Sequence, residues 1–168
     1  MTIKVGDRLP EGQLNEFIEV EAAGCSLGPN TFNISDLVKG KTIVVFGLPG
    51  AFTPTCSAKH VPSYLQHCST LKAKGVDEIW CMSVNDAFVM GAWGRDQKTA
   101  GKIRMMADGS ADYSRKLGLE LDLISRGMGV RCQRFSMLVQ DGVVKSINVE
   151  APGKYEVSDA ETMLRLLG

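Results

Sequence analysis

The residues best placed to do chemistry surround one cysteine in the stretch GLPGAFTPTCSAKHVP, residues 47–62. An aliphatic run that ends at Leu48 precedes the cysteine, and such a run is typical of a buried central strand. Thr53 is a favoured helix N-cap, and Pro54 suits the first position of a helix. Cys56 is therefore expected in the first turn of a helix, at about its third position.

That position is chemically special for a thiol. The first turn of a helix favours an anion, because its N–H groups are unpaired and the helix dipole is positive at that end. A free cysteine has a pKa of ~8.5, and a helix N-terminus can lower a thiol pKa to roughly 3.5–7.5. The carboxyl end of a strand in an α/β sheet is also where ligands bind. We therefore expect Cys56 to be a reactive thiolate rather than a cysteine that only packs in the core.

Composition narrows the class of protein. The chain has 168 residues, 44% of them hydrophobic, which predicts a single domain over residues 1–168. Basic and acidic residues are equal in number, 19 of each, which argues against a nucleic-acid partner. No run is long and apolar enough to cross a membrane, and the N-terminus lacks the apolar core of a signal peptide. Five cysteines without a CxxC motif, and only two histidines, argue against a metal site and favour a reducing, cytoplasmic setting.

The elements that must position Cys56 alternate between strand and helix after a loop-rich N-terminal third that includes residues 22–33. Strands are predicted at 42–48, 77–84 and 103–107, and helices at 54–74, 86–98, 111–117 and 159–167. The caps expected are Asn85 for the second helix and a Ser158/Glu161 capping box for the last. Asp141-Gly142 predicts a hairpin between 134–140 and 143–149. This succession predicts an α/β, thioredoxin-like fold with a central mixed β-sheet flanked by helices.

Three strings of the sequence together resemble one family. The spacing Pro49-x-x-x-Thr53-x-x-Cys56 is similar to the signature of peroxiredoxins. With SVNDAFVMGAWG and RFSMLVQDGVVKSINVE, it resembles the type II subfamily, or peroxiredoxin 5 class, which includes glutaredoxin-dependent enzymes. The resemblance runs from about Val5 to Leu167. It implies a thiol-dependent peroxidase that reduces hydrogen peroxide and organic hydroperoxides in antioxidant defence, without a cofactor.

The resemblance also implies a role for each matching residue. Cys56 resembles the peroxidatic cysteine that becomes a sulfenic acid, and Thr53 the hydroxyl that orients the peroxide and hydrogen-bonds the sulfur. Arg134 resembles the arginine that holds the thiolate and polarises the peroxide, and Pro49 the proline that shields the site from water. Fixed donors of this kind stabilise the charge that moves to the leaving oxygen. The alternatives are an N-cap for Thr53, a strand terminator for Pro49, and Arg131 in place of Arg134.

Other residues near Cys56 allow more than one interpretation. His60 lies four residues after Cys56 on the same helix face, which permits a catalytic Cys–His pair. A structural role is favoured, because the peroxiredoxin mechanism needs no histidine base. Pro62 is expected to disturb the helix. Trp93 and Phe88 are expected in the core or the pocket wall. Phe52 is expected at a contact of the homodimer that the resemblance implies.

The sulfenic acid must be reduced again or it over-oxidises. Some family members use a second cysteine near the C-terminus, but the corresponding position here is about Ser158. The other cysteines are Cys25, Cys68, Cys81 and Cys132. Cys68 lies about 18 Å along the helix from Cys56, beyond disulfide reach. A one-cysteine cycle with glutathione as co-substrate and glutaredoxin as partner is favoured, and thioredoxin or an internal disulfide stays open.

Three alternatives belong to other classes of protein. A non-enzymatic thiol redox sensor that signals to a partner would use the same Cys56. A thioredoxin-fold binding or chaperone module would not need Cys56 at all. A cysteine hydrolase is disfavoured, because the sequence offers no supported His–Asp or His–Asn relay.

Overall fold

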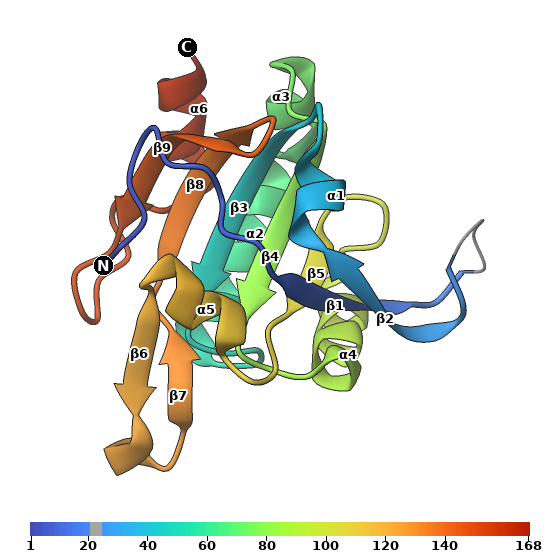
Figure 1. Cartoon of the computed structure of the whole chain (residues 1–168), viewed down its shortest axis with the longest axis vertical. Helices are drawn as coiled ribbons and strands as arrows, with labels where there is room; N and C mark the ends of the chain where they lie inside the picture. The colour runs from blue at the N-terminus through green and yellow to red at the C-terminus, as the bar shows by residue number, and fades with distance from the viewer. Residues whose placement is uncertain (21–24) are drawn as a thin grey trace.

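The computed structural model describes residues 1–20 and 25–168, and its centre is a seven-stranded mixed sheet (Figure 1). The strand order is β2-β1-β5-β4-β3-β8-β9. The strands are β1 (Gln13–Ile18), β2 (Gly28–Asn33), β3 (Thr42–Leu48), β4 (Glu78–Ser83), β5 (Arg104–Ala107), β8 (Phe135–Gln140) and β9 (Val143–Val149). A separate two-stranded sheet pairs β6 (Glu120–Leu123) with β7 (Gly129–Cys132).

Helices cover both faces of the main sheet. They are α1 (Ile34–Val38), the π-helix η1 (Cys56–His60), α2 (Val61–Gln66), α3 (Cys68–Ala73), α4 (Ala87–Gln97), α5 (Asp112–Leu117), the 3₁₀-helix η2 (Ile124–Arg126) and α6 (Ala160–Leu167). Residues of α1 and α5 pack on one face, in front of the sheet in Figure 1. Residues of η1, α2, α3, α4 and α6 pack on the other. None of the described helices has the length and hydrophobicity that a membrane span requires.

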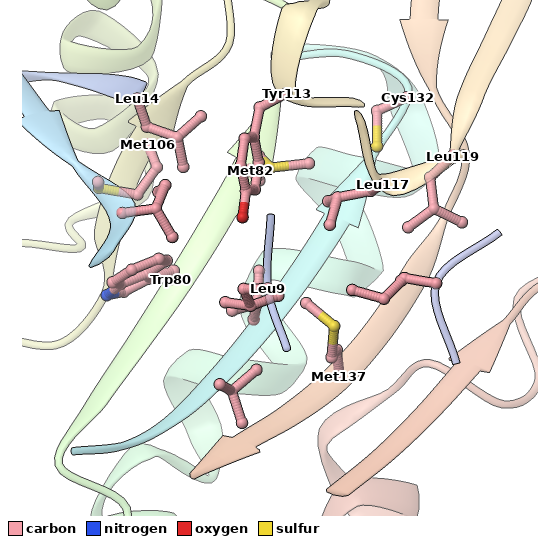
Figure 2. Close-up of a cluster of buried hydrophobic side chains, with 14 of the residues drawn as sticks. Leu9, Leu14, Trp80, Met82, Met106, Tyr113, Leu117, Leu119, Cys132 and Met137 are labelled. Carbon is pink, nitrogen blue, oxygen red and sulfur yellow. The ribbon is translucent and has the colours of Figure 1, made fainter. Parts of the chain in front are cut away.

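The central strand β3 divides its side chains between these two faces. Ile43 and Val45 belong to the cluster on the α1 and α5 face, which also contains the residues of Figure 2. Val44, Phe46 and Leu48 belong to the cluster on the opposite face, with Cys56. Successive side chains of a strand point to opposite faces, so a strand covered on both sides is apolar throughout. The continuous apolar run in the sequence predicts β3 for this reason.

The structure confirms the fold class predicted from the sequence, with helices on both sides of a mixed sheet. It confirms β3, β4 and β5 to within one residue at each end, with β3–β4 and β4–β5 parallel. The predicted hairpin is β8–β9, and its turn residues Asp141 and Gly142 have φ values of 47° and 80°. A two-residue turn with both φ values positive matches the right-handed twist of the strands it joins.

The loop-rich reading of the N-terminal third is wrong for residues 28–33. Gly28–Asn33 forms β2, which pairs antiparallel with β1 at the edge of the sheet. The segment GPNTFN contains glycine, proline and asparagine, which usually indicate a turn. At an edge, however, Pro29 needs no ladder partner for its missing N–H. Residues 22–24 of the predicted loop lie outside the described residues.

The predicted helix over residues 54–74 is present but irregular. Its first turn is helical from Pro54, widens into the π-helix η1 ahead of Pro62, and is interrupted again at His67 between α2 and α3. Pro62 has no N–H to donate, so regular α-helical bonding cannot continue through it. The helix ends at Gly75, whose φ of 98° suits a glycine C-cap.

Two predicted caps are wrong by one residue. The α4 cap is Asp86, whose Oδ1 accepts from the Val89 N–H at 2.9 Å, and not Asn85. The α6 cap is Asp159, whose carboxylate accepts from the Thr162 N–H, and not Ser158. In both cases two adjacent residues have capping side chains, and local preference does not distinguish between them. Asn85 and Ser158, which do not cap these helices, form hydrogen bonds with other parts of the chain instead.

Gly47 allows β3 to approach the neighbouring β8 closely. A Cβ at Gly47 would overlap the ring of Phe135, which is opposite it in the β3–β8 register. We expect Gly47→Ala to lower the free energy of unfolding by about 1–3 kcal/mol, because overpacking forces a buried ring to move. Urea unfolding measures this change. Gly109→Ala is the control, since its Cβ would meet only ordinary contacts, and an equal loss in both variants would contradict the packing argument.

Candidate active site

Cys56 lies where the sequence places it, at the third residue of the helix that follows β3. Pro54 and Thr55 precede it in the helical turn, and the Ser57 N–H donates to the Thr53 carbonyl at 3.0 Å. The Cys56 side chain is fully buried, in the cluster on the α4 face of the sheet. A buried thiolate needs fixed donors or a cation beside it, because burial disfavours an isolated charge.

Arg134 supplies that cation. Its Nη2 donates to Cys56 Sγ at 3.1 Å. Gly47 of β3 pairs with Phe135 of β8, so the residue just before β8 lies beside the loop that follows β3. The register of two antiparallel strands thus brings together residues that are 78 positions apart. An arginine is always charged and offers several donors in one plane.

Arg131 has a different role from Arg134. Its Nε donates to the Met128 carbonyl at 2.8 Å, and its Nη1 donates to the Pro49 carbonyl at 3.3 Å. Its guanidinium therefore links β7 to the loop before Cys56. No hydrogen bond from Arg131 to the sulfur occurs among the described residues. Of the two arginines that the sequence offers, the geometry places Arg134 at the thiol.

The loop between β3 and Cys56 is held in a strained form. Phe52 has a φ of 64°, an unfavourable value for a bulky residue. The Thr53 Oγ1 donates to the Gly50 carbonyl at 2.7 Å, and none of the hydrogen bonds described joins this hydroxyl to a helix N–H group or to the sulfur. The Ala51 N–H donates to Asn85 Oδ1 at 3.0 Å. These bonds, with that of Arg131, fix a conformation that the local sequence alone would not prefer.

Asn85 is one of the site residues that sequence reasoning missed. Its Oδ1 also accepts from the Ser83 hydroxyl at 2.6 Å, which ties the loop to the end of β4. Its side chain is thus committed to the loop before Cys56, which explains why it does not cap α4. The signal in the sequence was the paired Asn85-Asp86 after a buried strand, because two capping residues in succession leave one available for another partner.

His60 contacts Arg134 and not Cys56. Arg134 Nη1 lies 2.9 Å from His60 Nδ1, and His60 Nε2 lies 3.0 Å from the Ser158 carbonyl oxygen. Burial and the nearby charge of Arg134 lower the pKa of His60 from 6.5 to about 3. His60 is therefore neutral at physiological pH, and the interpretation as a Cys–His catalytic pair finds no support in the geometry. The geometry agrees instead with a structural role for His60.

Two of the other cysteines, Cys81 and Cys132, are fully buried. Cys132 packs beside Leu117 and Leu119 on the α1 and α5 face of the sheet (Figure 2), whereas Cys56 belongs to the cluster on the opposite face. Burial raises the pKa of Cys132 to about 12. Cys81 is fully buried in β4, and burial raises the pKa of its thiol well above the usual range. Only Cys25, among the five, has a partly exposed side chain. Although Cys132 lies only two residues before Arg134 in the sequence, its side chain packs on the other face of the sheet.

A concavity of about 340 Å³ opens beside Arg134, the residue that contacts the thiol. Its wall includes Pro49, Thr55, Arg134, Glu150 and Tyr155. A larger cavity of about 770 Å³ lies between β1, α4 and β5, and its lining includes none of the four predicted site residues. In the part of the chain that the structure describes, no three His, Cys, Asp or Glu side chains gather to hold a metal ion. The smaller cavity is therefore the one lined by two of the four predicted site residues, Pro49 and Arg134, and Cys56 is not among its described lining residues.

Trp93 and Phe88, both on α4, differ in their surroundings. Trp93 is fully buried, as expected, and its Nε1 donates to the Ser57 hydroxyl at 3.0 Å. Phe88 is 64% exposed, so its assignment to the core or pocket wall is wrong. The Phe88 ring instead lies on the surface beside Phe17, with ring centroids 5.8 Å apart.

Comparison with known proteins identifies the class that this fold and site define. The Redoxin family profile matches residues 4–164. Peroxiredoxin-2B of Arabidopsis thaliana is 46% identical over 98% of both chains. Reduced Prx3 of Vibrio vulnificus in complex with H₂O₂ is 46% identical, with a TM-score of 0.91 over 99% of this chain and 100% of that one. A Burkholderia cenocepacia structure, described provisionally as a thioredoxin reductase, is 62% identical, with a TM-score of 0.97 over 98% of both chains.

The chain belongs to the Redoxin family and, within it, to the peroxiredoxins. Its relatives include type 2 peroxiredoxins and a peroxiredoxin 5, which confirms the subfamily expected from the sequence motifs. Peroxiredoxins are thiol peroxidases, so the protein is a thiol-dependent peroxidase with an antioxidant function.

The low pKa of His60 leads to a prediction about acid stability. Arg134, Tyr64 and Tyr155 are the titratable or charged groups around its ring. The unfolded chain binds a proton at His60 below pH 6.5 and the folded chain does not until about pH 3. Between pH 6.5 and about pH 3, the free energy of unfolding should therefore decrease as the pH is lowered. His60 contributes up to about 1.4 kcal/mol of this decrease per pH unit.

Two measurements test this prediction. Nitrogen-15 NMR should show a neutral His60 with its proton on Nε2 from about pH 4 to pH 8. Urea unfolding should show a shallower loss on acidification for His60→Asn, which lacks the titrating group. A protonation midpoint of His60 near its ordinary value would contradict the prediction.

Proposed function

We propose that Cys56 is the peroxidatic residue of this thiol peroxidase, with no cofactor. Its thiolate attacks one oxygen of a hydroperoxide, so that an S–O bond forms as the O–O bond breaks. The sulfur is oxidised to a sulfenic acid, and the departing oxygen takes a proton and leaves as water or an alcohol. The observation that carries this proposal is the 3.1 Å contact of Arg134 with a buried Cys56 at the start of a helix.

The remaining roles follow the same logic. Arg134 stabilises the thiolate and then the negative charge on the departing oxygen. Thr53 orients the peroxide through its hydroxyl, which must then turn from the Gly50 carbonyl that it now contacts. Pro49 lines the concavity beside Arg134 and shields the thiol from water. A fixed cation helps most when it is in place before charge develops.

We propose a one-cysteine cycle for reduction of the sulfenic acid. Glutathione attacks it to give a mixed disulfide and water, and glutaredoxin or a second glutathione then releases the thiolate and carries away the oxidised thiol. Ser158, at the position of the second cysteine of some relatives, is buried and donates its hydroxyl to Glu150 at 2.6 Å. The burial of Cys81 and Cys132 also supports an external reductant. Thioredoxin is the second candidate.

We also propose that the chain forms one domain over residues 1–168, is located in the cytoplasm and assembles as a homodimer. Free cysteines support a reducing compartment. Phe52 and Phe88 support the dimer, because they are 53% and 64% exposed beside the same helix, α4. Exposed aromatic side chains of this kind are enriched in protein interfaces.

The second candidate function is a redox sensor, which would use Cys56 without sustained turnover of peroxide.

The intact mass of the protein after one equivalent of hydrogen peroxide, with and without glutathione, tests the cycle. We expect one added oxygen on Cys56, which becomes a glutathione adduct when glutathione is present. Cys56→Ser should show neither change and no peroxide consumption. Loss of two hydrogens without glutathione would replace the one-cysteine cycle with an internal disulfide. Absence of any rapid change at Cys56 would overturn its peroxidatic role, and oxidation without repeated turnover would favour the sensor.

The proposed dimer predicts a second outcome. Phe88→Glu should shift the protein from dimer to monomer in sedimentation velocity, because a buried unpaired charge is costly at an interface. Leu166→Glu is the matched control, since Leu166 is 48% exposed on α6 and not on α4. A dimer that survives Phe88→Glu, or that Leu166→Glu disrupts instead, would show that this face is not the interface.

A further inference from the structure

His60 has an unusual pair of partners for a buried histidine. An arginine can only donate hydrogen bonds, so His60 Nδ1 accepts from Arg134 Nη1 at 2.9 Å. A neutral imidazole then carries its proton on Nε2, which donates to the Ser158 carbonyl at 3.0 Å. One guanidinium therefore contacts His60 and Cys56 at the same time, through its two terminal nitrogens.

The turn that carries the Ser158 carbonyl is itself held by a buried carboxylate. Glu150 accepts from the N–H groups of Glu156, Val157 and Ser158, each at 2.9 Å, and from the Ser158 hydroxyl at 2.6 Å. Burial acts to raise the pKa of Glu150, but these hydrogen bonds outweigh it and hold that pKa below its usual range. Glu150 thereby fixes the turn before α6. The Tyr64 hydroxyl donates to the same Ser158 carbonyl at 2.9 Å.

Aromatic rings isolate this hydrogen-bond chain. The His60 ring lies between Phe46 and Tyr155, with centroids 4.8 Å and 5.2 Å away. The Arg134 Cζ is 5.9 Å from the centroid of Tyr155. His60 is completely buried, so an apolar side chain of similar size in its place would occupy the site without offering Arg134 an acceptor. Arg134 would then lose one of the two side-chain bonds that orient its guanidinium and would be freer to turn away from the sulfur.

We propose that His60 is a positioning residue that holds the Arg134 guanidinium against Cys56, with the Glu150-bound turn at Ser158 fixing the orientation of His60. The proposal rests on the proposed roles of Cys56 and Arg134. It gives His60 a function without proton transfer: Nδ1 stays an acceptor throughout the reaction. A donor that is already in place loses little freedom when charge develops on the peroxide oxygen.

Two substitutions of nearly equal shape separate this role from packing. His60→Leu and His60→Asn both replace the ring with a branched side chain of four heavy atoms, but only asparagine keeps a side-chain acceptor near the position of Nδ1. Loss of a hydrogen bond to a charged group predicts that His60→Leu lowers the rate constant of reduced Cys56 with hydrogen peroxide by about 10- to 100-fold. His60→Asn should stay within about threefold of the wild-type constant. Stopped-flow tryptophan fluorescence measures both.

The rate of Cys56 with iodoacetamide is a second readout, because alkylation needs no donor to a departing peroxide oxygen. We expect the ratio of the peroxide rate to the alkylation rate to fall in His60→Leu and to recover in His60→Asn. Arg134→Met removes the guanidinium, so it gives the lowest ratio that displacement of Arg134 could produce. Tyr64→Phe is the matched control, since it removes the other donor to Ser158 without touching Arg134.

The outcomes distinguish failure of the His60 positioning role from failure of the proposed function of Cys56. Equal peroxide rates in wild type and His60→Leu, or equal losses in His60→Leu and His60→Asn, would overturn the positioning role alone. An equal loss in Tyr64→Phe, which leaves the His60–Arg134 bond in place, would show that the loss does not come from that bond and would also overturn the positioning role. Failure of the wild-type Cys56 to react with peroxide would overturn the proposed function instead. Glu150→Gln should lower the same ratio, because an amide cannot accept four hydrogen bonds where a carboxylate does.

Discussion

The contact between Cys56 and Arg134 is the interaction on which the rest of the site depends. In the proposed function the sulfur must carry negative charge, yet it is buried in a hydrophobic cluster, where an isolated charge is disfavoured. Arg134 lies just before β8 and Cys56 after β3, and these strands are neighbours at the centre of the sheet. The sheet thus supplies the rigid frame that holds the two side chains together.

The fold maintains this contact through several polar side chains that never touch the sulfur. Asn85 and Arg131 each bind a backbone group of the loop that begins at Pro49. Their bonds offset the strain at Phe52, whose left-handed φ would be costly in a free peptide. On the other side, His60 accepts from the guanidinium of Arg134. Both partners of the Cys56–Arg134 contact are therefore restrained from different elements of the structure.

This arrangement also explains why the local rules misassigned two helix caps. Asn85 and Ser158 have side chains that suit a helix N-terminus, and each is followed directly by an aspartate that caps instead. Asn85 is engaged by the loop before Cys56, and Ser158 by the carboxylate of Glu150. Where adjacent residues have similar capping preferences, the tertiary partner available to one of them decides between them.

The sequence by itself determined the apolar strands β3 and β4, the β8–β9 hairpin and the position of Cys56 in the first turn of a helix. These features depend on hydrophobic period, turn residues and proline, all of which act over a few neighbouring residues. The motif resemblance added Thr53, Arg134 and Pro49 as site residues. Tertiary structure alone decided that β2 is an edge strand, that Phe88 is exposed, and that His60 faces Arg134 rather than Cys56. Those outcomes depend on strand register and on contacts between residues far apart in the chain, which no local pattern encodes.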